Sequence, residues 1–177
     1  MSAQVVLITG ALTGIGRAAA VAFAKKGSNV VISGRRDEAG QALAKEPQSL
    51  GAEAEFINAD VRKEDDVRAL VDKTVARFGR LDNAVNNAAT EGDRGLITAQ
   101  TAKSFAATFD TNVLRVVLSM KHEVRAMQAQ GSGSIINISS TYGMKARPEL
   151  RSTLGPNTLS KASPSRWCSR SPSREFA

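Results

Sequence analysis

A glycine-rich turn at 9–16, with the sequence TGALTGIG, is the stretch of this chain best suited to bind a phosphorylated ligand. A β-branched apolar run at 5–8 precedes it, and an alanine-rich run with helical spacing follows it at 17–26. The turn is therefore predicted to join a strand buried on both faces to a helix. The N-terminus of that helix would direct unpaired N–H groups and a partial positive charge into the turn, which suits a pyrophosphate.

Three glycines are expected to shape this turn. Gly10 permits the tight bend, Gly14 lets a ligand come close to the backbone, and Gly16 lets the helix pack closely on the strand. Their spacing differs from the G-x-G-x-x-G of the commonest dinucleotide fingerprint, and a glycine-rich turn can also be a plain loop. The turn therefore needs support from the rest of the chain.

Polar residues that follow the other predicted strands supply that support. These strands are predicted at 29–33, 54–58, 81–86 and 134–138. Arg35, Asp60, Asn87 and Ser140 come just after them. Because the carboxyl ends of parallel strands meet at one edge of a sheet, where ligands bind, we expect these residues to lie near Gly10.

Helices are predicted between the strands, at 17–26, 37–50, 67–78 and 99–130. Asp37 can cap the second helix, and Pro47 should end or bend it early. This alternation predicts an α/β fold, a Rossmann-like doubly wound parallel sheet with helices on both faces.

With these elements in place, the chain resembles the short-chain dehydrogenase/reductase family over residues 4 to about 143. The resemblance rests on five motifs in the family's order: TGALTGIG at 9–16, Asp60-Val61, NNAA at 86–89, Asn112 within DTNV, and SIINISS at 134–140. Residues 1–143 are accordingly expected to form one NAD(P)-binding Rossmann domain.

The resemblance also implies a site. Asp60 would contact the adenine, Asn87 and Ala88 would border the cofactor, and Asn112 and Ser140 would belong to the catalytic group. Ala89 stands where the family usually has glycine, so its methyl group would crowd the cofactor slightly. The expected cofactor-binding residues are Gly10, Thr13, Gly14, Ile15, Gly16, Arg35, Arg36, Asp60, Val61, Asn87 and Ala88.

Simpler interpretations exist for several of these residues. Asp60 could cap the next helix, Asn112 could be a polar residue within its helix, and Ser140 could make only turn hydrogen bonds. His122, the only histidine, lies mid-helix between charged residues and is expected on the surface. We find no metal-ligand spacing in the sequence and therefore expect no metal.

The end of the second strand predicts which cofactor is preferred. A carboxylate there would bind the ribose hydroxyls of NAD and repel a 2′-phosphate. This chain has Gly34 followed by Arg35 and Arg36, either of which can pair with that phosphate. We therefore predict that NADP(H) is preferred over NAD(H), although paired arginines can also be only a solvated approach to a helix.

Two residues of the family's chemistry are missing. The resemblance implies a tyrosine proton donor, whose ordinary pKa of about 10 is lowered by a lysine and by the cofactor. Thr153 and Asn157 occupy those positions, and neither can substitute. Aligning on Ser160-Lys161 recovers the lysine but places Asn157 at the tyrosine position. Tyr142, the only tyrosine, is too close to the serine. The active site is thus predicted to be incomplete.

The composition changes abruptly near Met144. Residues 1–140 carry a net charge of +2 and residues 141–177 a net charge of +5. Residues 163–174 contain two prolines and five serines without apolar periodicity, which is typical of a disordered tail. Back-translating 144–163 with permitted codons, and reading from the third base of codon 144, can place a tyrosine at position 153 and a lysine at position 157.

We therefore hypothesise that 144–177 is a frameshifted, disordered tail and that the fold is truncated after the fifth strand. That strand would then be left as an exposed edge. We expect poor solubility, no dehydrogenase activity and no stable oligomer of this chain, whereas an intact family member should be an active homo-oligomer.

The predicted function is hydride transfer between NAD(P)(H) and a small-molecule alcohol or ketone, with a non-catalytic dinucleotide-binding protein as the alternative. Nucleic-acid binding through the basic tail is a third hypothesis, and we set it aside because an altered frame accounts for the tail.

There is no run of 18 apolar residues, so no membrane span is expected. The single cysteine, Cys168, fits a cytoplasmic location.

Overall fold

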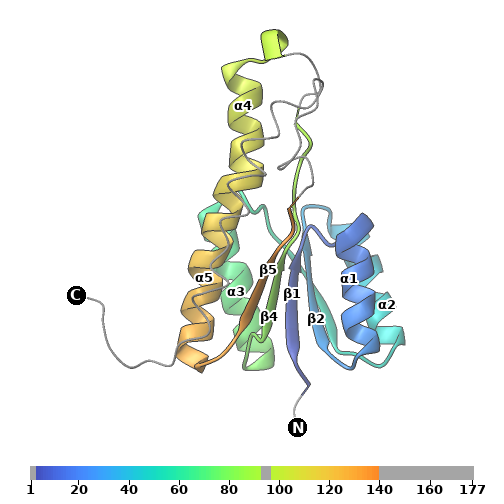
Figure 1. Ribbon diagram of the computed structural model, residues 1–177. Coiled ribbons are helices and arrows are strands. Elements are labelled where there is room, and N and C mark those ends of the chain that lie inside the picture. Colours follow the sequence, from blue (N-terminus) through green and yellow to red (C-terminus); the bar gives the residue numbers. More distant parts are fainter. Residues whose placement is uncertain (1–2, 93–96, 140–177) are drawn as a thin grey trace, which may run out of the picture.

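The computed structural model describes residues 3–92 and 97–139 (Figure 1). The predictions for Ser140, Tyr142, Thr153 and Asn157, and for the tail at 144–177, fall outside these residues.

Within the described residues, five parallel strands form one sheet, in the order β3-β2-β1-β4-β5. At its centre, Leu7 of β1 lies between Val31 of β2 and Ala84 of β4. The crossover between β3 and β4 places the switch in strand order beside β1. The Rossmann-like fold predicted from the sequence is confirmed. The strands are β1 (Val5–Thr9), β2 (Asn29–Gly34), β3 (Ala54–Asn58), β4 (Asn83–Asn86) and β5 (Ser134–Asn137).

Helices cover both faces of this sheet (Figure 1). Val6 and Ile8 of β1 pack in a core with α1 (Gly14–Lys25) and α2 (Asp37–Ser49), whereas Leu7 packs in a second core with α3 (Glu64–Phe78) and α5 (Arg115–Gln130). Both faces of β1 are buried, which explains its continuous apolar sequence. Within the described part of the chain, no helix is long and apolar enough to cross a membrane.

The helical region predicted at 99–130 is interrupted by a π-helical turn. A 3₁₀ turn (η1, Ile97–Ala99) precedes α4 (Ala102–Phe109), and the π turn (η2, Asp110–Leu114) joins α4 to α5. Thr101 and Ser104 form a capping box at the start of α4. Figure 1 shows α4 extending past the carboxyl ends of the strands, so that α4 rises above the edge where the predicted site residues gather.

The predicted helix cap at Asp37 is wrong. Arg36 occupies the N-cap position, Asp37 is the first helical residue, and Asp37 Oδ1 accepts a hydrogen bond from Asn58 Nδ2 at 2.8 Å. The carboxylate therefore joins α2 to the end of β3 instead of capping its own helix. Pro47 lies in the last turn of α2, which ends at Ser49.

The predicted surface location of His122 is also wrong. Its residue is only 5% exposed, and the imidazole Nε2 lies 3.4 Å from Glu64 Oε1 at the start of α3. His122 follows the buried Leu118 by one helical turn, so both lie on the face of α5 that packs against α3. Charged residues on either side of His122 in the sequence lie on other sides of the helix, so they do not indicate whether His122 is exposed.

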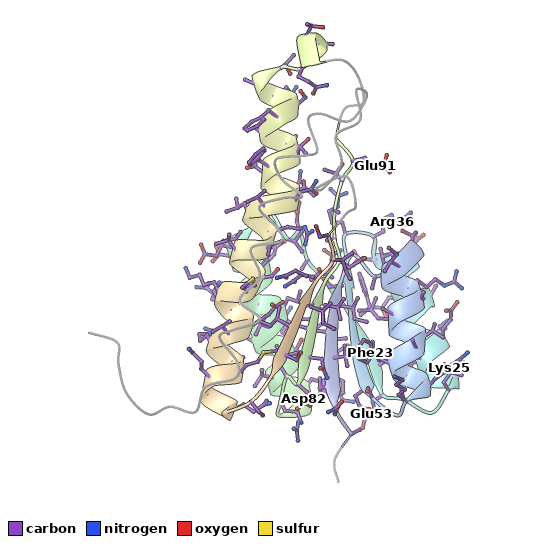
Figure 2. All side chains as sticks on the ribbon, viewed as in Figure 1. Phe23, Lys25, Arg36, Glu53, Asp82 and Glu91 are labelled. Atoms are coloured by element: carbon purple, nitrogen blue, oxygen red, sulfur yellow. The ribbon has the colours of Figure 1, made fainter. Side chains whose placement is uncertain are left out.

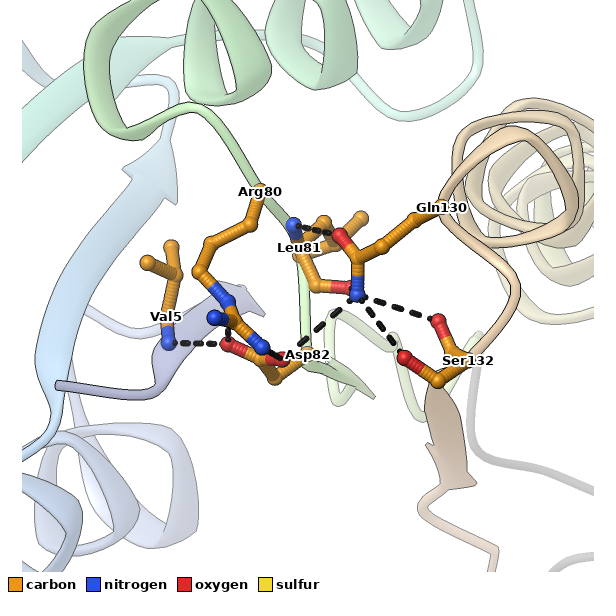
Figure 3. Close-up of polar contacts among 6 residues, drawn as sticks. All are labelled: Val5, Arg80, Leu81, Asp82, Gln130 and Ser132. Carbon is orange, nitrogen blue, oxygen red and sulfur yellow. Dashed lines mark hydrogen bonds and ion pairs between the residues drawn. The ribbon is translucent and has the colours of Figure 1, made fainter. Parts of the chain in front are cut away.

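Asp82 organises the end of the sheet opposite the predicted site (Figures 2 and 3). Its carboxylate accepts hydrogen bonds from the Val5 backbone N–H at 2.8 Å and from Arg80 Nε at 2.7 Å. Gln130, at the end of α5, accepts from the Leu81 backbone N–H at 2.9 Å. These contacts join the start of β1, the start of β4 and the end of α5, and β4 begins at Asn83 instead of the predicted residue 81.

Candidate functional site

A cleft of about 810 Å³ opens at the carboxyl ends of the central strands. It is lined by the loops that follow β1, β2, β3 and β4, and by one side of α4. Figure 2 places Arg36 and Glu91 toward this end of the molecule. Of the residues predicted to bind the cofactor, the cleft is lined by Gly10, Thr13, Gly14, Ile15, Arg35, Arg36, Asp60, Val61, Asn87 and Ala88.

The glycine-rich turn presents an open helix N-terminus to this cleft. Gly10 and Gly14 have φ angles of +64° and +55°, a region that disfavours other residues. The N-cap residue of α1, Thr13, makes no side-chain capping hydrogen bond, and the first turn holds no acidic residue. The N–H groups and partial positive charge of α1 are therefore available to an anion.

Gly16 lies beneath the cleft and does not line it. A Cβ atom there would lie 2.6 Å from Asn87 Nδ2 and 2.6 Å from the Gly10 carbonyl oxygen. Asn87 Nδ2 donates to that same oxygen at 2.9 Å, and the Asn87 backbone N–H donates to Thr9 Oγ1 at 3.2 Å. The close packing predicted at Gly16 is thus with the Gly10 carbonyl oxygen and the Asn87 side chain. The hydrogen bonds of Asn87 hold the glycine-rich turn against the end of β4.

The end of β2 combines a close backbone approach with positive charge. A Cβ atom at Gly34 would lie 2.7 Å from Leu12 Cδ1, so a larger residue would require the Leu12 side chain to move. Ser33 Oγ is buried and has no hydrogen-bond partner within the described residues. Arg35 and Arg36 are exposed and line the cleft beside it. The two exposed guanidinium groups are suited to pair with a phosphate in the cleft.

Asp60 pairs with Arg62, a residue that the sequence analysis did not single out. Arg62 Nε lies 3.0 Å from Asp60 Oδ1 and 3.2 Å from Oδ2, and the Arg62 backbone N–H donates to Oδ1 at 3.1 Å. These hydrogen bonds outweigh partial burial and hold the pKa of Asp60 at about 2. Asp60 is not the cap of α3, because Lys63 holds the N-cap position.

Asn112 does not line the cleft. Its residue is 2% exposed within the π-helical turn, and its side-chain amide contacts the backbone of Thr90. Thr90 does line the cleft, next to Ala89. Asn112 therefore acts on the site through the loop that it holds.

A buried polar cluster lies below this loop. Asn86 Nδ2 donates to Glu123 Oε2 and to Asn137 Oδ1, both at 3.0 Å. Burial raises the pKa of Glu123 to about 7, although the Asn86 hydrogen bond and the charge of Arg115 oppose the rise. Burial also lowers the pKa of Arg115 to about 10. Arg115 Nε and Nη1 have no hydrogen-bond partner among the described residues.

Sequence reasoning missed the wall of the cleft that comes from the loop after β4, from α4 and from the start of the π turn η2. These residues are Thr90, Gly92, Ser104, Ala107, Thr108 and Thr111. Gly92 has a φ of +71°, and a Cβ atom there would lie 2.5 Å from Thr108 Oγ1. The only signal in the sequence was the row of small and hydroxyl side chains along α4, which a generic surface helix would also carry.

Comparison with known proteins identifies the family. Residues 4–152 match the family described as short chain dehydrogenase. The chain is 37% identical over 145 residues to a 3beta-hydroxysteroid dehydrogenase of Mediterraneibacter gnavus, a match that covers 82% of this chain and 52% of that protein. This chain belongs to the short-chain dehydrogenase/reductase family. It spans about half the length of the curated relatives that it matches.

Solved structures agree with this assignment. NAD+-bound xylitol dehydrogenase superposes with a TM-score of 0.85 at 29% identity, covering 88% of this chain and 60% of that one. A variant of actinorhodin polyketide ketoreductase with NADPH gives a TM-score of 0.84 at 31% identity, covering 89% and 60%.

Proposed function

We propose that this chain is the dinucleotide-binding part of an oxidoreductase that transfers hydride between NAD(P)(H) and a small-molecule alcohol or ketone. The observation that carries the proposal is the cleft at the switch in strand order, where an uncapped helix N-terminus, two arginines and a fixed carboxylate line one volume. Membership of the family, and relatives whose names are dehydrogenases and reductases, support the same reaction class.

The residues present fit a dinucleotide. The Gly10–Gly16 turn and the first N–H groups of α1 would hold the pyrophosphate, because the backbone at Gly14 faces open space. Gly10 lets the turn pack against Ala88, whose Cα would lie 2.5 Å from a Cβ atom at Gly10. Asp60 would accept a hydrogen bond from the adenine amino group. Ile15, which is 65% exposed, offers the bound cofactor an apolar contact.

At the nicotinamide end, the bound cofactor would supply a hydride donor or acceptor. Asn112 would hold the Thr90 loop beside it, and Ser140 would hydrogen-bond the substrate oxygen, as the family's pattern implies. A proton must also reach or leave that oxygen. Thr153 stands at the expected position of the tyrosine donor and Asn157 at that of the lysine, and neither supplies this proton transfer. We therefore expect this chain to bind the cofactor without turnover.

We further propose a preference for NADP(H). The exposed Arg35 and Arg36 line the cleft after β2, and Gly34 stands where a carboxylate would repel a 2′-phosphate, so this end of β2 favours a 2′-phosphate over free ribose hydroxyls. Fluorescence titration of the 177-residue chain with NADPH and NADH tests this preference. We expect tighter NADPH binding that Arg35→Ala weakens. Equal or tighter NADH binding, unchanged in Arg35→Ala, would refute the preference.

Turnover requires a second comparison, between this chain and a version read in the alternative frame after codon 144. Oxidation of NADPH on a panel of ketones should appear only with the reframed protein. Turnover by the original chain would contradict the missing proton donor. Sequencing the encoding DNA around codon 144 checks the frame itself, and an uninterrupted original frame would remove the frameshift hypothesis.

We propose a cytoplasmic location, because a chain with a single cysteine fits a reducing compartment.

A further inference from the structure

Arg62 is held flat against the carboxylate of Asp60 at the edge of the cleft. Besides the Nε contacts at 3.0 and 3.2 Å, Arg62 Nη2 lies 2.5 Å from Asp60 Oδ2. The Asp60 backbone N–H in turn donates to Asp66 Oδ2 at 3.0 Å, from the first turn of α3. Both the main chain and the side chain of Asp60 are therefore fixed before any ligand arrives.

This pairing leaves the carboxylate with limited spare capacity. A carboxylate offers about four lone-pair sites. Three N–H groups of Arg62 occupy about three of these sites: the backbone N–H, Nε–H and an Nη2–H. The side chain of Asp60 is 15% exposed, so its remaining capacity can be reached only from the solvent side of the cleft.

We propose that Arg62 is a positioning residue that makes Asp60 selective for adenine, an inference that rests on the proposed dinucleotide function. A fixed, ionised carboxylate with one free acceptor direction favours a ring that presents an amino group. It disfavours a ring that presents a carbonyl oxygen in the same place, as hypoxanthine does, because two acceptors would then face each other.

The fork of the guanidinium is what this role requires. An ammonium group keeps the charge but cannot hold two carboxylate oxygens in one plane. The positive charge of Arg62 is also neutralised by its ion pair with Asp60, so Arg62 is less available to bind a phosphate than an unpaired arginine would be. Arg62 is thus expected to govern selectivity for the base, while Arg35 and Arg36 govern selectivity for the 2′-phosphate.

The test measures binding only and uses the 177-residue chain with NADPH, NADH and the hypoxanthine analogue of NADPH. Wild type should bind NADPH roughly tenfold more tightly than the analogue, the value of one hydrogen bond to a charged group. Arg62→Lys and Arg62→Ala should reduce this ratio to about threefold or less while the NADPH/NADH ratio stays unchanged. Arg68→Lys, in an exposed ion pair with Asp65, is the matched control.

A double-mutant cycle with Asp60→Asn separates the mechanism from a folding defect. If Arg62 acts through Asp60, Arg62→Lys should have no further effect on the base ratio in the Asp60→Asn background. An unchanged base ratio in Arg62→Lys overturns the inference and leaves the proposed function standing. A fall in the NADPH/NADH ratio alone would make Arg62 a phosphate ligand and also overturn it. Absence of all NADPH binding in wild type would overturn both.

Discussion

The side-chain amide of Asn112 makes two hydrogen bonds to one backbone residue, Thr90. Asn112 Oδ1 accepts from the Thr90 N–H at 2.9 Å, and Asn112 Nδ2 donates to the Thr90 carbonyl oxygen at 2.7 Å. The amide reproduces the pairing of a neighbouring strand and holds the loop after β4 against the π-helical turn. Because Thr90 lines the cleft, the position of this wall depends on an amide that never enters it.

Replacing Asn112 tests this role. Asn112→Asp keeps the size and the acceptor for the Thr90 N–H, but its second oxygen would face the Thr90 carbonyl oxygen. We expect both Asn112→Asp and Asn112→Ala to lower the free energy of unfolding by about 1–3 kcal/mol and to weaken NADPH binding. Urea unfolding and cofactor titration measure the two effects, with the exposed Ser134→Ala as control. An NADPH affinity of Asn112→Asp equal to that of wild type would contradict the role of this amide in positioning the Thr90 loop.

The glycines of the turn should differ in what they tolerate. Gly16→Ala places a Cβ atom 2.6 Å from the Gly10 carbonyl oxygen, so the turn must move. We expect a loss of about 1–3 kcal/mol of stability and weaker NADPH binding.

Gly14 and Gly27 offer a matched pair of alanine substitutions. Both positions have a positive φ and open space around the Cβ position, but only Gly14 lines the cleft.

These two alanine variants should therefore lose similar stability, on the order of 1 kcal/mol, from the backbone conformation alone. Only Gly14→Ala should weaken NADPH binding. Equal affinities in the two variants would show that the ligand does not approach the backbone at Gly14.

Glu123 should make stability depend on pH near neutrality. Its native pKa of about 7 lies above the unfolded value of about 4.3, so the native state retains a proton that the unfolded state releases. The stabilisation is complete below about pH 4.3 and is lost as the pH rises through about 7, a change on the order of 3 kcal/mol.

Urea unfolding of wild type and Glu123→Gln between pH 4.5 and 8 measures this change. Glutamine cannot ionise but can still accept the hydrogen bond from Asn86, so its curve should lack the decline. Glu38→Gln, at an exposed position, is the control. Parallel pH profiles for wild type and Glu123→Gln would rule out a buried titrating carboxyl.

Asp82 should act in the opposite direction. Burial raises its pKa, but the hydrogen bonds from Arg80 and from the Val5 N–H outweigh burial and leave the pKa lowered. Its stabilisation is present above the unfolded pKa of about 3.9 and is lost as the pH falls through the native value. We expect Asp82→Asn to melt at a lower temperature at pH 7 and to lose less stability on acidification.

Thermal melts at pH 7 and at pH 3–4 check this prediction. The matched control is Asp65→Asn, whose side chain is 86% exposed and paired on the surface with Arg68. If Asp65→Asn and Asp82→Asn lose the same stability, the contacts to the start of β1 contribute nothing measurable.

Local sequence was sufficient for the order of the elements and for the side of the cleft that the loops after the strands form. The alternation of apolar strands with helical periodicity depends on neighbours only a few residues apart, so the order of strands and helices could be predicted. Residues just after parallel strands must meet at one sheet edge, which is why Gly10, Arg35, Asp60 and Asn87 were found together.

Tertiary structure decided what each of those groups contacts. That His122 faces α3, that Asn112 holds Thr90 and that Glu123 lies beneath Asn86 all depend on packing between segments distant in the sequence. A helical residue's spacing tells which neighbours share its face, but only the packed partner tells whether that face meets solvent, protein or ligand. For the same reason, Arg62 became visible as the partner of Asp60 only once the end of β3 had its three-dimensional shape.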